Sequence, residues 1–364
     1  MAHGRRLCSI SLITTIGAVL LAWFSVAAAQ SSDETGMARG KPAQLIENVT
    51  LEYPPDELSR RREGWVKLSY VVTNDGTVVD PVIEDSGGSR GFEQSALGAV
   101  VKLLYEPAIW DGEPVEQCFT GVLITFSLSD AETGMSGAFN RRYREINRSL
   151  TSDALDEVRR LIDDAFENFS LNVADLARLW MLRGSYAQKV GDDELQLIAS
   201  RKAVEDGGRW VSDGVYRRLM TSIISLELSA GDYASALTDH AALVEKMGDG
   251  AVLKNLQRSI DTARKQLDTA EVLAVPARLT ANRQCDDCLA DWQSGALRRN
   301  LSISNIKGSL ENIEIRCEWQ RVVDEARSGV VWTLPEEWGE CRIIIFGEAG
   351  STFDLHEIEP ALQE

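Results

Sequence analysis

Residues 63–83 read EGWVKLSYVVTNDGTVVDPVI, which is two apolar runs separated by a short polar turn. The first run, Trp65–Val72, alternates apolar and polar residues, and the second run is Val78–Ile83. The turn contains Asp75-Gly76, and Asp-Gly is favoured in tight hairpins because its φ > 0 conformation matches the twist of the flanking strands. The stretch therefore predicts a β-hairpin.

A helix and a third strand are predicted after this hairpin. Between Phe92 and Tyr105 the apolar residues have helical spacing: Phe92, Ala96, Leu97, Val100, Leu103 and Leu104. Pro107 is expected to end the helix, because its ring clashes with the preceding turn and it has no N–H. A final apolar run covers Val122–Phe126. The order predicts a β-β-α-β unit in which one helix packs across a three-stranded antiparallel sheet.

Short motifs in the segments that connect these strands and the helix indicate a family. Tyr53-Pro54 precedes the hairpin, Ser86-Gly87 follows it, and Tyr105-Glu106-Pro107-Ala108 follows the helix. In this order, and with the Asp-Gly turn, they resemble the TonB C-terminal domain, and residues 47–130 are identified as a member of that family. The resemblance covers about a fifth of the chain, so the remainder is interpreted from its own residues.

The resemblance implies a peptide-binding edge. In the TonB family the last strand is a sheet edge that captures an extended segment of a partner, such as an outer-membrane receptor, by strand addition. Carried onto this sequence, the edge is Thr120–Leu128, with Gly121, Val122, Ile124 and Phe126, and Tyr53-Pro54 would lie near the captured peptide. The apolar side chains of this edge strand are also expected to face the helix. The backbone of the strand, and not these side chains, would then be the functional part.

The N-terminus has the features of an export signal over residues 1–29. Arg5-Arg6 precede the apolar stretch Leu7–Val26, and Ala27-Ala28-Ala29 fit a cleavage site. These features predict a periplasmic protein. The apolar stretch is also long enough to cross a bilayer, so an uncleaved inner-membrane anchor, and with it a TonB-type energy transducer for outer-membrane transport, stays open as an alternative.

Residues 30–46 are predicted to be a flexible linker. The whole stretch Gln30–Glu52 contains one proline, Pro42. A flexible segment of this length spans roughly 25–30 Å, whereas the resemblance implies a long Pro-rich spacer in a transducer. The composition of this segment therefore disfavours the transducer and leaves the domain assignment unchanged.

Residues 138–275 are predicted to be helical. Two apolar stripes at helical spacing lie within 155–166 and 252–267. Between them, Gly191-Asp192 and Gly231-Asp232 resemble the turns of tetratricopeptide repeats, but they lie 40 residues apart, whereas that repeat has a period of about 34. The region is therefore described as TPR-like, and helical hairpins without a peptide groove are the alternative. Pro276 is expected to end it.

Residues 276–364 are predicted to form a small antiparallel β domain. The alternating segments 301–303 and 313–315 flank Gly308 and are expected to form a hairpin. Further strands are expected at Val330–Trp332, Cys341–Phe346 and Phe353–Ile358. The whole chain is thus predicted to be an α+β multidomain protein: a TonB-like domain, a helical-hairpin region and a small β domain.

Five cysteines follow the predicted signal, and disulfides are their default state in an oxidising compartment. Cys317 and Cys341 lie in or beside predicted strands and are the first candidate pair. Cys285-Asp286-Asp287-Cys288 could also be disulfide-bonded, bind zinc or act in redox chemistry. Cys118 is expected to be a buried thiol or to bridge two domains.

Composition and motifs argue against two other classes of function. The formal charge of −18 disfavours binding to nucleic acid. Ser86 follows an aspartate as in a serine-protease motif, but only His240 and His356 remain after the signal, and Ser86 already belongs to the strand exit. No cofactor-binding loop is present. The sequence therefore predicts a binding protein, not an enzyme, and does not predict its oligomeric state.

Overall fold

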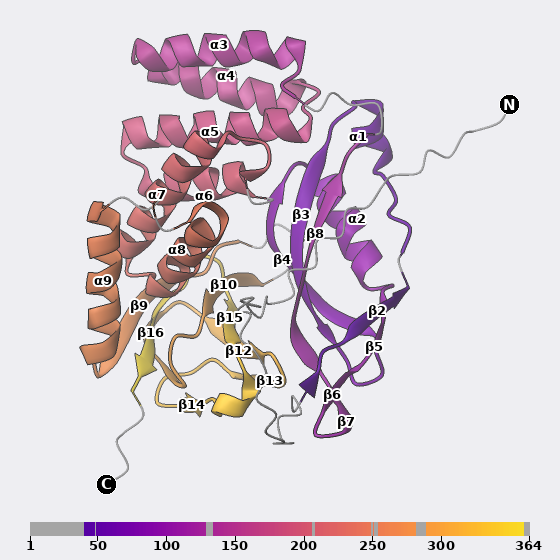
Figure 1. Cartoon of the computed structure of the whole chain (residues 1–364), viewed down its shortest axis with the longest axis vertical. Coiled ribbons are helices and arrows are strands. Elements are labelled where there is room, and N and C mark those ends of the chain that lie inside the picture. Colours follow the sequence, from indigo (N-terminus) through magenta and orange to yellow (C-terminus); the bar gives the residue numbers. More distant parts are fainter. Residues whose placement is uncertain are drawn as a thin grey trace, which may run out of the picture.

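The computed structural model describes residues 40–47, 49–128, 134–205, 208–248, 250, 254–281 and 289–359. It contains an N-terminal domain with a three-stranded sheet, a helical region and a C-terminal β-sandwich, in that order along the chain (Figure 1). The predicted α+β multidomain organisation is confirmed. The proposed export signal, residues 1–29, lies outside the described residues.

The N-terminal domain has the predicted β-β-α-β core. The main strands are β3 (Gly64–Val72), β4 (Val78–Gly87) and β8 (Gln117–Phe126), in the antiparallel order β4-β3-β8, and helix α2 (Arg90–Val100) packs across one face. Gly76 adopts φ +84° in the turn between β3 and β4. Alternate residues of the strands point at α2, which places Leu68 and Phe126 in one core with Phe92.

The predicted helix over Phe92–Tyr105 is too long at its C-terminal end. Helix α2 ends at Val100, and Leu104–Glu106 form strand β5, which pairs with β2 (Gln44–Glu47). Leu103 and Leu104 continue the helical spacing, but the chain turns away so that the Tyr105 hydroxyl lies 2.6 Å from that of Tyr70 in the core. A helix over this stretch could not deliver that side chain to the sheet.

Part of the segment expected to be a flexible linker is instead paired. Besides β2, strand β1 (Gly40–Lys41) pairs with β6 (Ala108–Trp110), which also pairs with β7 (Glu113–Val115). Residues 40–46 therefore belong to the folded domain. A short helix, α1 (Pro55–Ser59), precedes β3.

The central region is helical, as predicted. Its helices are α3 (Gly137–Thr151), α4 (Leu155–Asn168), α5 (Val173–Val190), α6 (Asp193–Val204), α7 (Asp213–Ala230), α8 (Tyr233–Met247) and α9 (Lys254–Thr269). Gly191 and Gly231 end α5 and α7 in the left-handed conformation, and the following aspartates, Asp192 and Asp232, cap the next helices. The two Gly-Asp turns thus join helices as the sequence predicted.

The helical region ends earlier than expected. Helix α9 stops at Thr269, and Pro276 lies within strand β9 (Val272–Arg278), opposite Asp354. Strand β9 is the edge of its sheet, and edge strands are where sheets tolerate proline, which has no N–H to donate.

The C-terminal part is a sandwich of two four-stranded sheets. One has the order β10 (Ala290–Gly295), β15 (Cys341–Gly347), β12 (Leu310–Cys317), β13 (Arg321–Glu325); the other has the order β14 (Val331–Thr333), β11 (Asn300–Lys307), β16 (Thr352–Ile358), β9. The hairpin predicted around Gly308 is wrong, because β11 and β12 belong to different sheets. Gly308, at φ +94°, carries the chain from one sheet to the other.

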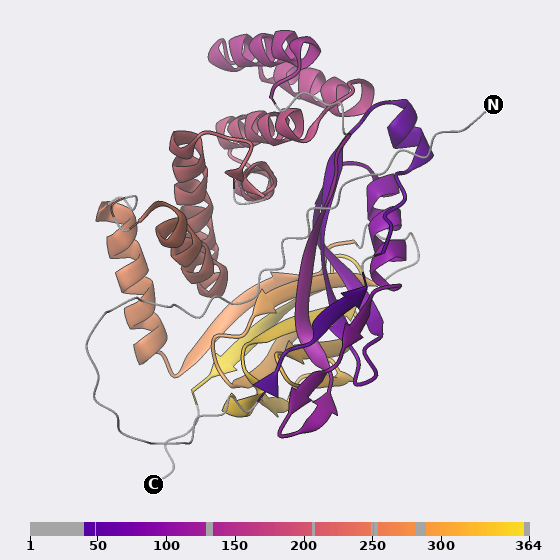
Figure 2. The same ribbon diagram turned by 45° about the vertical axis from the view of Figure 1, so that its right-hand side comes forward.

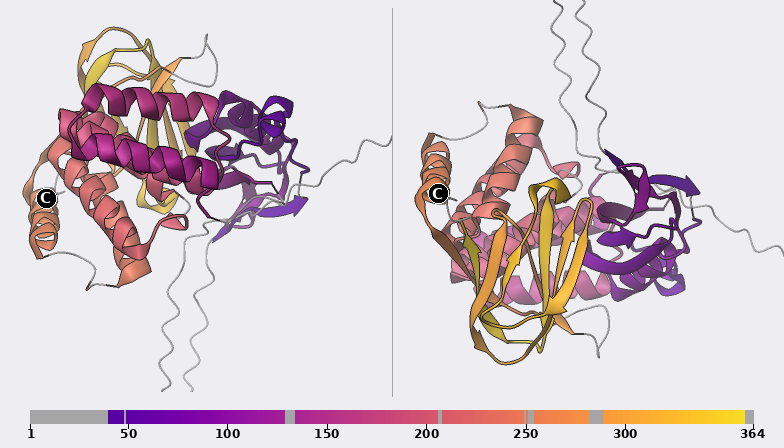
Figure 3. Two further views of the ribbon diagram at one scale, coloured as in Figure 1. Left: turned by 90° about the horizontal axis from the view of Figure 1, so that it is seen from above. Right: turned by 90° about the horizontal axis from the view of Figure 1, so that it is seen from below.

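The three parts pack against one another. Figure 2 shows the N-terminal sheet with α2 on one side and the helical region and sandwich on the other, and Figure 3 shows the sandwich strands beside both the helices and the N-terminal domain. At the sandwich, Arg342 pairs with Glu84, and the Trp110 and Trp319 rings lie 4.9 Å apart. Arg298 joins the sandwich to α9, since it donates to the carbonyl of Leu267 at 2.7 Å.

Candidate functional site: the edge strand of the N-terminal sheet

Strand β8 leaves one side of its backbone without a strand partner. It pairs with β3 from Gly64↔Phe126 to Val72↔Gln117, and within the described part of the chain no strand pairs with its other side. Every second residue of an edge strand directs its N–H and C=O away from the sheet. The outer side of β8 can therefore accept another strand.

The opposite edge, β4, is closed by three features. Pro81 has no N–H to offer, and Asp80 interrupts the extended backbone with φ +47°. Lys202 of α6 donates from Nζ to the carbonyl of Ser86 at 2.5 Å and also pairs with Asp85. Strand addition is therefore geometrically favoured on β8 and disfavoured on β4.

The apolar residues predicted for the edge point away from any added strand. Val122, Ile124 and Phe126 are 3%, 6% and 0% exposed, in the core under α2. Gly121 is half-buried in the same strand. Only the backbone of this segment, not these side chains, is positioned to contact a partner.

Tyr53 and Pro54 lie at the end of the sheet where β8 finishes. The Tyr53 ring packs edge-on against Phe92 and Phe126, with ring centroids 5.7 and 5.9 Å away. Its hydroxyl donates to the carbonyl of Arg62, and Pro54 precedes the first residue of α1. The structure thus brings Tyr53 and Phe126 together, although they are far apart in sequence.

The start of β8 is covered by other parts of the chain. A register shift after the Tyr70↔Thr120 pair places Cys118 on the side of the sheet that faces the sandwich, where it is a buried free thiol. Burial, and then Glu116, raise the pKa of this thiol to about 12. Gln117 accepts a hydrogen bond from the backbone N–H of Ala43 at 2.6 Å. Cys118 is therefore neither a bridge between domains nor a reactive group.

The far end of β8 is held by Glu63, a residue that no sequence signal singled out. Its carboxylate accepts from the N–H of Leu128 at 2.7 Å and from the N–H of Val173, at the start of α5, at 3.1 Å. Burial raises the pKa of Glu63, while these two backbone hydrogen bonds lower it. One carboxylate thus joins the edge strand to the helical region.

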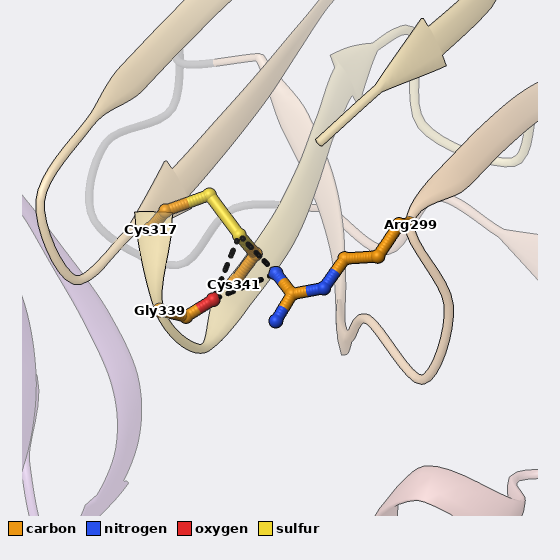
Figure 4. The surroundings of a disulfide bond; sticks show 4 residues. All are labelled: Arg299, Cys317, Gly339 and Cys341. Carbon is orange, nitrogen blue, oxygen red and sulfur yellow. Dashed lines mark hydrogen bonds between the residues drawn. A yellow bond between two sulfur atoms is a disulfide. The ribbon is translucent and has the colours of Figure 1, made fainter. Parts of the chain in front are cut away.

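Cys317 and Cys341 form a disulfide between paired strands, with an S–S distance of 2.00 Å (Figure 4). Arg299 lies beside it and donates to the carbonyl of Gly339 at 2.7 Å. These two cysteines therefore cannot also supply thiolates to a four-cysteine zinc site. Cys285 and Cys288 lie outside the described residues.

Two features of the described residues bear on the zinc site and on the membrane anchor. None of the His, Cys, Asp and Glu side chains in these ranges form a group of three or more that could hold a metal ion. Among the helices that the structure describes, none combines the length and apolar character needed to cross a bilayer.

Comparison with known proteins identifies the N-terminal domain. The family model described as Gram-negative bacterial TonB protein C-terminal matches residues 49–128. A structure of the TonB2 protein from Vibrio anguillarum is 30% identical, with 29% of this chain and 99% of that chain covered and a TM-score of 0.21. A solution structure of the Pseudomonas aeruginosa TonB C-terminal domain is 22% identical, with 28% and 100% covered and a TM-score of 0.22. A search of curated proteins gave no match. Through residues 49–128, this chain belongs to the TonB C-terminal domain family.

Proposed function

We propose that this chain is an envelope protein whose TonB-type domain binds an extended peptide of a partner protein as an added strand on β8. The observation that carries the proposal is the difference between the two sheet edges. The outer side of β8 has no strand partner among the described residues, whereas Pro81, Asp80 and Lys202 close β4. Family membership supports the same edge.

The affinity of such a site would come from the backbone. Gly121–Phe126 is six residues long and spans about 20 Å, enough for a ladder of hydrogen bonds to one extended segment. The side chains of that segment would alternate between the side of Tyr53 and α2 and the side of the sandwich. Nothing in this mode of binding requires catalysis or a cofactor.

The rest of the chain would hold this edge in a fixed position. Lys202, Glu63 and Arg342 connect the sheet to α6, α5 and β15. Periplasmic location is proposed from residues 1–29, and the energy transducer is the alternative if Leu7–Val26 is retained as an anchor. Mass spectrometry of the protein from a cell-envelope fraction separates the two, because a chain that begins at Gln30 has no such anchor.

Hydrogen exchange tests the binding mode. Nine-residue peptides with alternating apolar positions would be selected on the purified protein by phage display, and amide exchange would be compared with and without the selected peptide. We expect slower exchange within Gly121–Phe126 and unchanged exchange in β4. Protection confined to the helical region or to the sandwich would contradict the proposal.

A pair of proline variants provides the matched control. Adjacent N–H groups of β8 point in opposite directions, so of Leu123→Pro and Ile124→Pro one removes an outward donor and the other removes a hydrogen bond to β3. Thermal unfolding shows which variant keeps the sheet. That variant should lose peptide binding while it remains folded, and retained binding would exclude β8 as the acceptor.

A further inference from the structure

Two buried carboxylates lie where the N-terminal sheet meets the start of helix α5. Glu63, which directly precedes β3, is 3% exposed, and Asp175, in the first turn of α5, is 0% exposed. Burial raises the pKa of both carboxyls, and the charge of Asp175 adds to the rise at Glu63. It is therefore costly to keep both groups ionised at this junction.

The two carboxylates differ in their hydrogen bonds. Both oxygens of Glu63 accept backbone N–H groups, from Leu128 at 2.7 Å and from Val173 at 3.1 Å. In Asp175, Oδ1 accepts from the N–H of Ser136 at 2.9 Å, whereas Oδ2 is buried and has no hydrogen-bond partner among the described residues. Two N–H donors favour the charged form of Glu63. A proton at this junction therefore disturbs least on Oδ2 of Asp175.

Neighbouring hydrogen bonds depend on the position of these carboxylates. Asn172 donates from Nδ2 to the carbonyl of Gly134 at 2.9 Å, and its Oδ1 accepts from the N–H of Asp175 at 2.8 Å. The N–H of Glu63 donates to the carbonyl of Leu171 at 2.9 Å. The residues before β3, the residues after β8 and the start of α5 are thus held together at one place, which we call the α5 junction.

The cations around the α5 junction do not cancel the cost of burial. Arg61, before β3, favours the charged form of Glu63, and Arg178, on α5, favours that of Asp175, but burial is the larger effect at both carboxyls. One guanidinium nitrogen of Arg178 is used within its own helix, since it donates to the carbonyl of Ala174 at 2.8 Å. The N-terminus of α5 also favours negative charge, and burial still prevails.

We propose that Asp175 holds a proton on Oδ2 while α5 is packed against the end of β8, and that loss of this proton loosens the α5 junction. With the proton bound, the remaining charge lies on Glu63, where two N–H groups stabilise it. Without the proton, two negative charges are buried in one junction. A carboxyl whose pKa is higher in the folded chain stabilises the fold at low pH, and this contribution is lost as the pH rises through the raised pKa.

This device would also regulate the peptide edge, a consequence that rests on the proposed strand addition. Leu128 lies two residues after Phe126, the last residue of β8, and Glu63 holds its N–H. When the junction loosens, a captured peptide must order the end of β8 as it binds, which costs affinity. Peptide binding should therefore weaken as the pH rises.

Amide hydrogen exchange of the full chain without peptide tests the junction. Exchange would be measured between pH 5 and pH 8 and corrected for the chemical exchange rate. We expect the protection of Leu128, Ser136 and Val173 to fall about threefold or more, because each pH unit between the ordinary and the raised pKa changes the opening equilibrium about tenfold. Amides of β12, in the sandwich, should keep their protection, which separates opening of the junction from global unfolding. A flat profile at the junction overturns the proposal.

Two variants assign the effect to one carboxyl. Asp175→Asn keeps an oxygen for the N–H of Ser136 and is uncharged, so its protection should stay constant from pH 5 to pH 8. Asp156→Asn replaces an exposed acid in the first turn of α4 and should keep the slope of the unaltered protein. A slope that survives in Asp175→Asn overturns the assignment to Asp175. If that variant does not fold, the profile of the unaltered protein still decides whether the junction opens as the pH rises.

A peptide selected on the protein, without ionisable side chains, tests the link to β8. It should bind the unaltered protein more weakly at pH 8 than at pH 5, and bind Asp175→Asn equally at both. Constant affinity alongside pH-dependent protection overturns the link to the edge. If no peptide binds, strand addition and this link both fail, whereas the exchange result for the junction is independent of them.

Discussion

Lys202 of helix α6 donates a hydrogen bond to the backbone carbonyl of Ser86, 116 residues earlier in the chain. Its ammonium group also pairs with Asp85 and lies over the rings of Trp65 and Trp180, 5.7 and 5.3 Å from their centroids. A buried cation with these partners both closes the end of β4 and fastens the helical region to the sheet.

Replacing Lys202 by methionine should therefore destabilise the junction. The substitution keeps most of the side-chain volume but leaves Asp85 without its cation, and we expect a loss of about 2 kcal/mol, below that of a fully buried pair because Asp85 is partly exposed. Urea unfolding measures the loss, and hydrogen exchange should accelerate at the end of β4. Adding Asp85→Asn to the same chain should restore part of the stability. Equal midpoints for the variant and the unaltered protein would show that the contact does not stabilise the fold.

The local parts of this fold follow from local sequence. Alternation, the Asp75-Gly76 turn and the left-handed glycines Gly191 and Gly231 each depend on a few neighbouring residues, and the predicted hairpin and helix joints are confirmed. The errors concern where elements end and which strands pair with each other. Alternation indicates that 301–303 and 313–315 are strands, but it carries no information on which strands they pair with, and they lie in different sheets.

In the candidate site, too, the part that depends on local motifs was predicted and the long-range contacts were not. The edge β8 was predicted because the motifs of its family are short and ordered along the chain. The closing of β4 by Lys202 and the anchoring of Leu128 by Glu63 were not predicted. Both contacts join single polar residues to positions far away in the sequence, and a single residue forms no pattern before the chain is folded.

Glu227 should make the stability of the helical region depend on pH. Burial, and then the neighbouring Asp239, raise the pKa of this carboxyl from 4.5 to about 8, although Arg201 pairs with it. Between these two values the folded chain holds a proton that the unfolded chain releases, so this group's contribution to stability falls as pH rises from about 4.5 to about 8 and is constant above.

Glu227→Gln tests this directly, because glutamine keeps the shape of the protonated acid without titrating. The urea midpoint of the variant should fall less than that of the unaltered protein between pH 5 and pH 8. Glu245→Gln, an exposed position on α8, should leave the slope unchanged. Parallel pH profiles for the unaltered protein and the Glu227 variant would mean that this carboxyl is ionised in the folded chain.

Loss of the Cys317–Cys341 disulfide should destabilise the sandwich. The cysteines are 24 residues apart, and closing a loop of this size restricts the unfolded chain by about 3 kcal/mol in the chain-entropy account. The double variant Cys317→Ser, Cys341→Ser should therefore unfold at a lower urea concentration. A reducing agent should lower the urea midpoint of the unaltered protein by a similar amount and leave the midpoint of the double variant unchanged. If the reducing agent lowers the urea midpoints of both proteins equally, the stabilising disulfide involves other cysteines.

Gly40 should be required where the first strand meets the junction between the N-terminal domain and the sandwich. A Cβ at this position would lie 2.7 Å from the ring of Trp110 and 2.7 Å from that of Trp319, and neither ring can move without separating the pair. Gly40→Ala should thus weaken the Trp110–Trp319 contact, lower the melting temperature and reduce the near-ultraviolet circular dichroism of the tryptophans. Gly98→Ala is the matched control, because a Cβ there meets no atom within 4 Å and alanine at this exposed position in the last turn of α2 should not destabilise the protein. Unchanged dichroism and an unchanged melting temperature in Gly40→Ala would show that β1 does not hold this junction together.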